Sequence, residues 1–330
     1  SAYGAIGNQY FRYYKLANAE AITLSGQVSI RWIEQKMNKY LNNLLKTEDE
    51  DYVIASDTDS IYLNMGSVVD KFFANRSGDK AKIVELLDMV CRDKLEPYID
   101  ECYQNLANYV SAYDQKMQMK RENIADRGIW TAKKRYILNV WDSEGVRYEE
   151  PKLKVMGIES VKSSTPAPCR KMLKDAFKIL MTGTEDDMIK FIDSSRDQFK
   201  KLPPEEVSFP RSVSDVVKYK SHSSIYNKGT PIHARGALLY NHYIKENKLD
   251  AKYSLIQNGE KIKFCYLKKP NHIHENVISF IQDFPKELNL DKYIDYDLQF
   301  EKSFLEPLKT ILDSIGWNVE KTVNLELFFG

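Results

Sequence analysis

Cysteine is scarce in this sequence, with four residues in 330: Cys91, Cys102, Cys169 and Cys265. No two of them have Cys-x-x-Cys spacing and no histidine lies beside one at ligand spacing, which argues against a structural zinc site. Long apolar runs are lacking too, because none approaches the roughly 20 residues that a membrane helix needs. The start shows no signal-peptide pattern. We therefore expect free thiols, a reducing cytoplasm and no membrane partner.

The sequence also lacks an excess of either charge. Its 48 Lys and Arg residues nearly balance 47 Asp and Glu residues, which leaves a formal net charge of +1. This balance neither requires nor excludes nucleic acid, because a local basic groove can exist within a neutral total. The length allows about two domains, and a hydrophobic fraction of 43% is enough for their cores.

Hydrophobic spacing predicts an alternation of helices and strands. Helical spacing predicts helices at 18–45, 80–112 with a break at Pro97, 166–181, 185–202, 231–248 and 294–315. Strand patterns predict a hairpin at 52–63, strands at 117–124, 129–141, 146–150 and 153–158, and two short strands around Tyr253 and Phe264. We expect an α+β fold with a domain boundary near residue 160.

Two carboxylates, Asp57 and Asp59, flank Thr58 at the expected tip of the hairpin. Residues i and i+2 share a face in an ideal strand, so both side chains could converge on one spot. At ~4 Å their charges would repel by about 4 kcal/mol at an effective dielectric near 20, which a shifted pKa, a basic partner or a divalent cation would offset. Such oxygen ligands suit Mg²⁺, and two ions can clamp the reacting oxygens of a phosphoryl transfer. An ordinary Asp-rich turn is the alternative.

Five segments resemble those of one enzyme family and follow its order. The segment 54–63 resembles the Asp-Thr-Asp-Ser hairpin of family B DNA polymerases, and residues 1–8 resemble the end of that family's fingers motif. The segments Phe11–Tyr14, Trp130–Tyr136 and Lys162–Pro166 follow. The resemblance covers the whole chain and indicates the replicative polymerases of myovirus bacteriophages, which act in the cytoplasm of the infected host.

The resemblance implies four regions and a catalytic site. The regions are the end of the fingers with the entry to the palm at 1–17, the palm at 18–160, the thumb at 161–318 and a clamp-binding tail at 319–330. Asp59 would bind both catalytic Mg²⁺ ions, with Asp57 in support and Glu122 as a further acidic position; a solvated carboxylate is the alternative for Glu122. Tyr3, Gly4 and Thr58 would lie beside the incoming dNTP or the nascent base pair, although Tyr3 could also be a core aromatic.

DNA contacts are implied at three places. The run Lys133–Tyr136, made of Lys133, Lys134, Arg135 and Tyr136, lies in a predicted strand, where alternation would separate Lys134 from its neighbours; Lys134 would reach the minor groove at the primer end. A solvated charged face is the alternative. Lys162, Ser163, Ser164 and Thr165 offer a lysine and three hydroxyls before a helix. Arg235, Gly236, Tyr240 and Asn241 resemble a thumb element that holds primer phosphates.

The two ends of the chain carry further hypotheses. Leu325, Phe328 and Phe329 resemble a sliding-clamp-binding peptide, although they could also fold back on the thumb. Ser1 falls inside the fingers motif, which leaves a split gene, a truncation or a protein-splicing junction open. The second metal-binding aspartate, the fingers cations and the exonuclease domain of the family are absent from this sequence. We therefore expect inactivity without an N-terminal part, or alternatively a non-catalytic DNA- and clamp-binding remnant.

Overall fold

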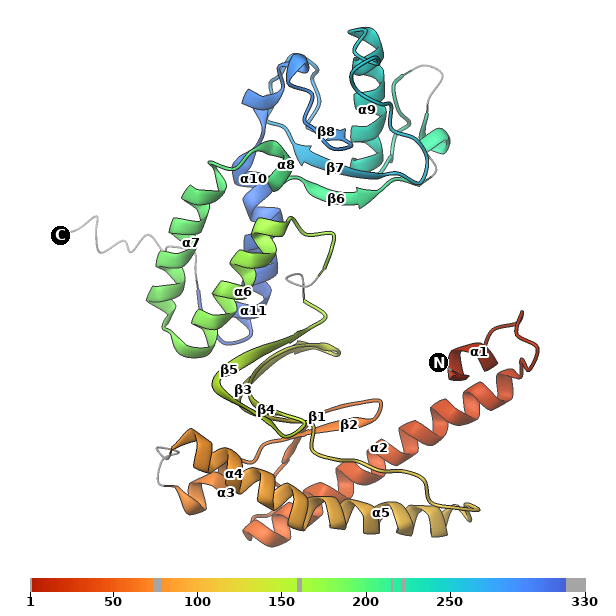
Figure 1. Cartoon of the computed structure of the whole chain (residues 1–330), viewed down its shortest axis with the longest axis vertical. Helices are drawn as coiled ribbons and strands as arrows, with labels where there is room; N and C mark the ends of the chain where they lie inside the picture. Colours follow the sequence, from red (N-terminus) through yellow and green to blue (C-terminus); the bar gives the residue numbers. More distant parts are fainter. Residues whose placement is uncertain (1, 74–78, 159–161, 215, 221–223, 319–330) are drawn as a thin grey trace, which may run out of the picture. The chain divides into compact units, whose positions relative to one another are not determined.

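The computed structural model describes residues 2–73, 79–158, 162–214, 216–220 and 224–318. The chain divides into two compact units (Figure 1). Unit 1 holds residues 1–127 and 139–152, and unit 2 holds residues 128–138 and 153–330. The region limits expected at residues 18, 161 and 319 remain predictions.

The longest helix of unit 1, α2 (Leu16–Leu45), starts two residues before its predicted position. Its buried side chains include Ile33, Met37 and Leu41, which recur every four residues and so line one face. That face packs on residues of α5 (Glu96–Tyr109) in a shared core. The short helix α1 (Ala2–Ile6) precedes α2.

A second helical stretch of unit 1 passes through Pro97 without ending there. It runs from α4 (Lys80–Val90) through a π-helical turn (Cys91–Leu95) into α5. Proline has no backbone N–H to donate, and the wider turn directly before it lets the helical path continue. The helix therefore does not end at Pro97, where a break was expected, and a π-turn lies directly before α5. The helix α3 (Gly66–Phe72) was not predicted.

The three-stranded sheet β3–β4–β5 corrects two sequence expectations. Its strands are β3 (Asn123–Ala132), β4 (Arg135–Ser143) and β5 (Val146–Met156). The single strand expected at 129–141 is wrong, because Lys133 and Lys134 form a turn with a φ of +62° at Lys134. The strand expected at 117–124 is also wrong, since 117–122 has no regular structure. The gap between the strands expected at 129–141 and 146–150 contains a turn before β5, with positive φ at Glu144 and Gly145.

Unit 2 contains a helical core. Its helices are α6 (Ala167–Thr182), α7 (Glu185–Phe199), α10 (Tyr296–Phe300) and α11 (Glu306–Asp313), with a π-helical turn (Glu301–Leu305) before α11. Leu173, Phe177, Phe199 and Phe304 are fully buried between them. A capping box at Thr184 and Asp187 fixes the start of α7.

A second core of unit 2 lies between one helix and a sheet (Figure 1). The helix is α9 (Ile232–Glu246), and the antiparallel sheet has the order β6 (Phe209–Ser212), β7 (Lys261–Tyr266), β8 (Val277–Phe280). The strand expected around Phe264 is confirmed, whereas Tyr253 lies outside any strand. Short helical pieces complete the unit: α8 (Pro204–Val207), Val216–Tyr219, Lys286–Leu288 and Asp291–Tyr293.

The mixture of helices and small antiparallel sheets is compatible with the expected α+β class. Within the ranges that the structure describes, no helix has the length and apolar character to cross a membrane.

Candidate functional site

The predicted hairpin is present and presents its acidic tip to solvent. Strands β1 (Val53–Asp57) and β2 (Ser60–Leu63) pair antiparallel, with Asp57 opposite Ser60. Only Thr58 and Asp59 form the turn, and Thr58 has a φ of +22°. The strand anchors this tip, because Val53 at its start is 5% exposed and belongs to the core shared with α2 and α5.

The two aspartates occupy different parts of the hairpin. Asp57 ends β1 and accepts a hydrogen bond from the Thr58 hydroxyl at 3.0 Å, whereas Asp59 lies in the turn and is exposed. Strand alternation therefore does not decide their directions. Burial raises the pKa of the Tyr103 phenol, and the charges of Asp100 and Asp59 raise it further. The Asp59 carboxylate thus lies close enough to α5 for its charge to act on Tyr103.

The third predicted carboxylate, Glu122, is exposed and directly precedes β3. Its carbonyl accepts a hydrogen bond from the Glu144 amide at 2.6 Å, which holds it to the turn before β5. Among the described residues, no three His, Cys, Asp or Glu side chains gather as a metal-ligand group. The hairpin offers the carboxylates of Asp57 and Asp59, a kind of ligand that suits Mg²⁺. A complete metal site would need further ligands.

Arg121, the residue before Glu122, belongs to an ion-pair network that was not predicted from the sequence. Arg121 pairs with Asp88 on α4 and with Asp142 on β4, and its own amide donates to the Glu96 carboxylate at 3.0 Å. The Asp142 side chain is 1% exposed and also lies 3.6 Å from Arg147. A buried carboxylate needs such partners. The irregular segment 117–122 is thereby tied at its end to both the helices and the sheet.

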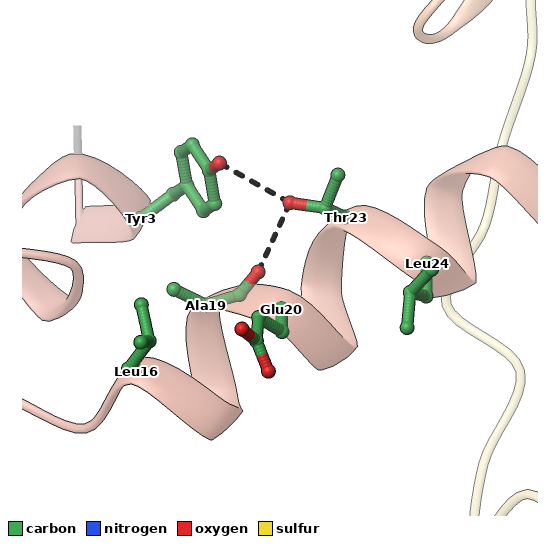
Figure 2. Close-up of a pocket in the computed structure, with 6 residues that line it drawn as sticks. All are labelled: Tyr3, Leu16, Ala19, Glu20, Thr23 and Leu24. Atoms are coloured by element: carbon green, nitrogen blue, oxygen red, sulfur yellow. Dashed lines mark hydrogen bonds between the residues drawn. The ribbon is translucent and has the colours of Figure 1, made fainter.

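A pocket of about 400 Å³ lies between α1 and α2 (Figure 2). Tyr3 reaches across it, and its hydroxyl lies 3.1 Å from the hydroxyl of Thr23, which donates to the carbonyl of Ala19 at 3.0 Å. Tyr3 is 49% exposed, so it is not the core aromatic that the sequence left open. Gly4 is exposed on the same helix.

The basic run forms the tip of the β3–β4 hairpin. Lys133 and Lys134 are exposed in the turn, and Tyr136 is buried beside Trp130. Gly157 lies directly behind the turn, because a Cβ atom there would be 2.3 Å from the carbonyl oxygen of Lys134. The tip therefore combines two exposed cations with a backbone that is held closely from behind.

The predicted segment Lys162–Thr165 is a tight turn. The amide of Thr165 donates to the carbonyl of Lys162 at 3.2 Å, and Thr165 is 6% exposed. Lys162 and Ser163 are exposed, whereas Ser164 is half-buried. The turn leads into Pro166 and α6, so it displays one lysine and one hydroxyl on a fixed support.

The residues on α9 that are predicted to form a thumb element are more deeply packed than the sequence suggests. Gly236 is buried, and a Cβ atom there would be 2.4 Å from the Ser279 hydroxyl on β8. Tyr240 is 1% exposed and donates to the Ser254 carbonyl at 3.2 Å. Asn241 exchanges two hydrogen bonds of 2.8 Å with the backbone of Ile256. These three residues stabilise the fold of α9 on its sheet.

Arg235 is half-buried on the same helix. Its guanidinium donates to the side chain of Asn276 at 2.6 Å and lies 5.6 Å from the ring centre of Tyr226, whose hydroxyl donates to Glu275. The side chain is therefore held in one orientation by its neighbours.

Two curated relatives match the chain along nearly its whole length. The DNA-directed DNA polymerase of Enterobacteria phage T4 is 34% identical over 342 aligned positions, which cover 100% of this chain and 38% of the relative. The DNA-directed DNA polymerase of Escherichia phage RB69 is 36% identical over 338 positions, which cover 98% of this chain and 37% of the relative. This chain is a relative of the T4-like phage DNA polymerases, matched to their C-terminal part. No protein-family model matches it.

Charge is distributed unevenly along this polymerase relative. Residues 211–274 contain 12 Lys and Arg against four Asp and Glu, whereas residues 275–330 contain five against 11. The near-neutral total therefore conceals a basic segment that includes the end of β6, and all of α9 and β7. Sequence reasoning that used only the net charge missed this segregation, which a count along the chain reveals. The predicted clamp-binding residues Leu325, Phe328 and Phe329 lie outside the described residues.

Proposed function

We propose that this chain is the C-terminal part of a DNA-directed DNA polymerase of family B, with the palm in residues 18–160 and the thumb in 161–318. The observation that carries the proposal is the match to two phage DNA polymerases along nearly the whole chain. The chain spans less than two-fifths of each relative. In this proposal, polymerase activity needs the N-terminal part of such an enzyme, with fingers and an exonuclease domain, in addition to the residues of this sequence.

In this proposal Asp59 provides an oxygen ligand for two Mg²⁺ ions, and an aspartate of the N-terminal part completes the site. Two properties of the hairpin support this role: its tip is exposed, and its strands are anchored in a core. Bound Mg²⁺ would neutralise charge on the triphosphate as the primer 3′-hydroxyl attacks the α-phosphorus of the incoming dNTP. Asp57 and Glu122 support the arrangement, and Thr58, Tyr3 and Gly4 border the nucleotide or the nascent base pair.

DNA contacts in this proposal are mostly sequence-independent, as a replicative enzyme needs. Lys134 reaches the minor groove at the primer end, with Lys133, Arg135 and Tyr136 beside or behind it. Lys162 and Ser163 bind phosphates of the primer–template duplex. Arg235, within the basic segment, adds a phosphate contact. The tail residues Leu325, Phe328 and Phe329 bind a sliding clamp, and the protein acts in the cytoplasm of a phage-infected host.

A reconstitution assay tests the proposal. The chain is mixed with the remaining part of a T4-like polymerase, and extension of a labelled primer is measured with Mg²⁺ and all four dNTPs. We expect extension by the mixture and none by either part alone. Binding of DNA and clamp by the chain, with no extension in the mixture, would instead support the non-catalytic remnant. Whether the parts arise from a split gene, a truncation or a protein-splicing junction is decided by sequencing the upstream coding region.

A further inference from the structure

Arg211 links two elements of unit 2 that lie far apart in sequence. It belongs to β6, yet one of its guanidinium nitrogens donates to the carbonyl of Ser164 at 3.0 Å and to the carbonyl of Pro210 at 3.1 Å. The guanidinium carbon also lies 6.0 Å from the ring centre of Phe209. One half-buried cation thus joins the turn before α6 to the edge of the sheet that packs on α9.

The hydrogen bond from Arg211 to the Ser164 carbonyl restrains the turn at residues 162–165. The turn is closed by a hydrogen bond from the Thr165 amide to the Lys162 carbonyl. The carbonyl of Ser164 takes no part in that bond and accepts from Arg211 instead. Thr165 and Pro166 are buried and lead into α6, whose Cys169 and Leu173 are fully buried. The turn is therefore held from α6 on one side and from Arg211 on the other.

Arg211 also lies near the start of α9. Burial lowers the pKa of His233, on the first turn of α9, and the positive charge of Arg211 lowers it further. Arg235 follows two residues later on that helix. The His233 ring centre also lies 6.4 Å from that of Phe264, which pairs with Phe209 on β6, two residues before Arg211. Arg211 is therefore near both parts of unit 2 that are proposed to hold DNA phosphates, the turn at 162–165 and the first turns of α9.

We infer that Arg211 is a positioning residue, which holds the turn 162–165 so that Lys162 reaches a phosphate of the same duplex that Arg235 contacts. The inference rests on the function proposed above. In this inference Arg211 acts through the turn: one of its guanidinium nitrogens donates to two backbone carbonyls, and no phosphate contact is assigned to it.

A double-mutant cycle tests this role in the full 330-residue chain. The affinity for a primer–template duplex is measured by fluorescence anisotropy across a salt series for Arg211→Gln, Lys162→Gln and the double variant. We expect each single variant to bind roughly tenfold more weakly. Each should flatten the slope of log K against log salt by about 0.9, the value for one phosphate contact. The double variant should match the single variants in both respects, because both changes remove the same contact.

Two other outcomes would overturn the inference, and they are distinguishable. If the losses add and the slope falls by two contacts, Arg211 binds a phosphate directly, and the role of Lys162 stands without it. If Lys162→Gln changes neither affinity nor slope, the proposed Lys162 contact fails, and the positioning role fails with it.

Hydrogen exchange provides a readout that does not depend on DNA. Arg211→Gln should speed exchange of the Thr165 amide, while Arg211→Lys, which keeps a cationic donor group, should restore part of its protection. The matched control is Lys263→Gln, because Lys263 lies opposite Pro210 on β7 and donates to the Glu205 carbonyl at 2.9 Å rather than to the turn. Equal exchange at Thr165 in Arg211→Gln and wild type would overturn the inference.

Discussion

At the residue scale, the exposed turn aspartate of the β1–β2 hairpin carries the proposed catalytic role. Asp59→Ala should abolish primer extension by the reconstituted enzyme, because the metals would lose a shared ligand. DNA affinity should change by less than about twofold, since the phosphate contacts lie elsewhere. Both quantities are measured on the same preparation.

A matched control separates ligation from charge alone. Asp100, like Asp59, is exposed and raises the pKa of Tyr103 through its charge, but it lies on α5 rather than at the hairpin tip. Asp100→Ala should leave extension near the wild-type rate. Full extension by the Asp59→Ala enzyme would contradict the metal-binding role.

Gly236 shows how one residue type can indicate two different functions. The resemblance to the polymerase family implies that the Gly236 backbone approaches a phosphate. In the structure, the missing Cβ allows α9 to lie against the backbone and hydroxyl of Ser279 on β8. A glycine can allow the backbone to approach a ligand or to approach another strand, because both need a residue without a side chain. The sequence alone does not distinguish these two roles.

Arg235 should contribute to both folding and DNA binding. Arg235→Ala should lower the free energy of unfolding by about 1–2 kcal/mol, because the bond to Asn276 and the contact with Tyr226 are lost. It should also flatten the salt dependence of DNA binding by about one phosphate contact. Urea denaturation measures the first effect and a salt titration the second.

The control for Arg235 is a similar arginine outside the proposed DNA surface. Arg196 stacks on Phe300 at 5.0 Å and lies 3.8 Å from Asp297. Arg196→Ala should reduce stability without altering the salt slope. If Arg235→Ala behaves in the same way, the phosphate contact is refuted and Arg235 is only structural.

At the element scale, sequence patterns predicted the long amphipathic helices and the acidic hairpin well. The buried residues of α2 recur at helical spacing, and the β1–β2 hairpin has apolar strands around a polar tip. The prediction failed at Lys133–Lys134, a basic pair between strand-like segments that was assigned to one continuous strand. There the positive φ of Lys134 and the close approach of Gly157 decide the conformation, and neither is visible as a change in hydropathy.

The glycine behind the β3–β4 turn offers a test of that packing. Gly157→Ala should destabilise the protein by roughly 2–4 kcal/mol, because its φ is +67° and the new Cβ would collide with the Lys134 carbonyl. Gly145→Ala is the control: its φ is +87°, but no atom lies within 4 Å of the new Cβ, so only about 1 kcal/mol of backbone strain is expected. Similar losses in chemical denaturation for both variants would argue against the contact.

The link between α4 and the β3–β4 pair should depend on pH. Burial would raise the pKa of Asp126, but hydrogen bonds from Asn139 at 2.8 Å and Lys80 at 3.0 Å outweigh it and lower the pKa below its usual value. The stabilisation is therefore complete above about pH 4, where an unfolded aspartate is ionised, and is lost as pH falls through the folded pKa. Asp126→Asn should flatten this acid dependence in denaturation experiments.

The control for Asp126 is an exposed acidic residue with a local partner. Asp114 pairs with Lys116 at 2.6 Å in the irregular segment after α5, where both side chains are exposed. Asp114→Asn should leave the stability profile between pH 2 and pH 5 close to wild type, because exposed pairs contribute little. An unchanged profile for Asp126→Asn would show that the link does not stabilise the fold.

At the scale of the whole molecule, the near-zero net charge results from segments of opposite sign. Residues 211–274 carry a net charge of +8, from 12 basic and four acidic residues, so the remainder carries −7 against the total of +1. A duplex is attracted to a local concentration of positive charge rather than to the sum. On the proposed function, the basic segment would favour contact with DNA, and the acidic remainder would limit non-specific binding elsewhere.

This segregation predicts that equal changes of net charge have unequal effects on DNA binding. Lys261→Gln combined with Lys269→Gln removes two exposed cations from the basic segment, residues 211–274. Lys286→Gln combined with Lys309→Gln removes two exposed cations from the acidic segment, residues 275–330. The first pair should weaken duplex binding about tenfold or more at low salt and flatten the salt slope, because counterion release follows the phosphates contacted. The second pair should leave both quantities within error of wild type. Equal losses for the two pairs would mean that DNA responds to the total charge of the chain, and the basic segment would then have no special role as a binding surface.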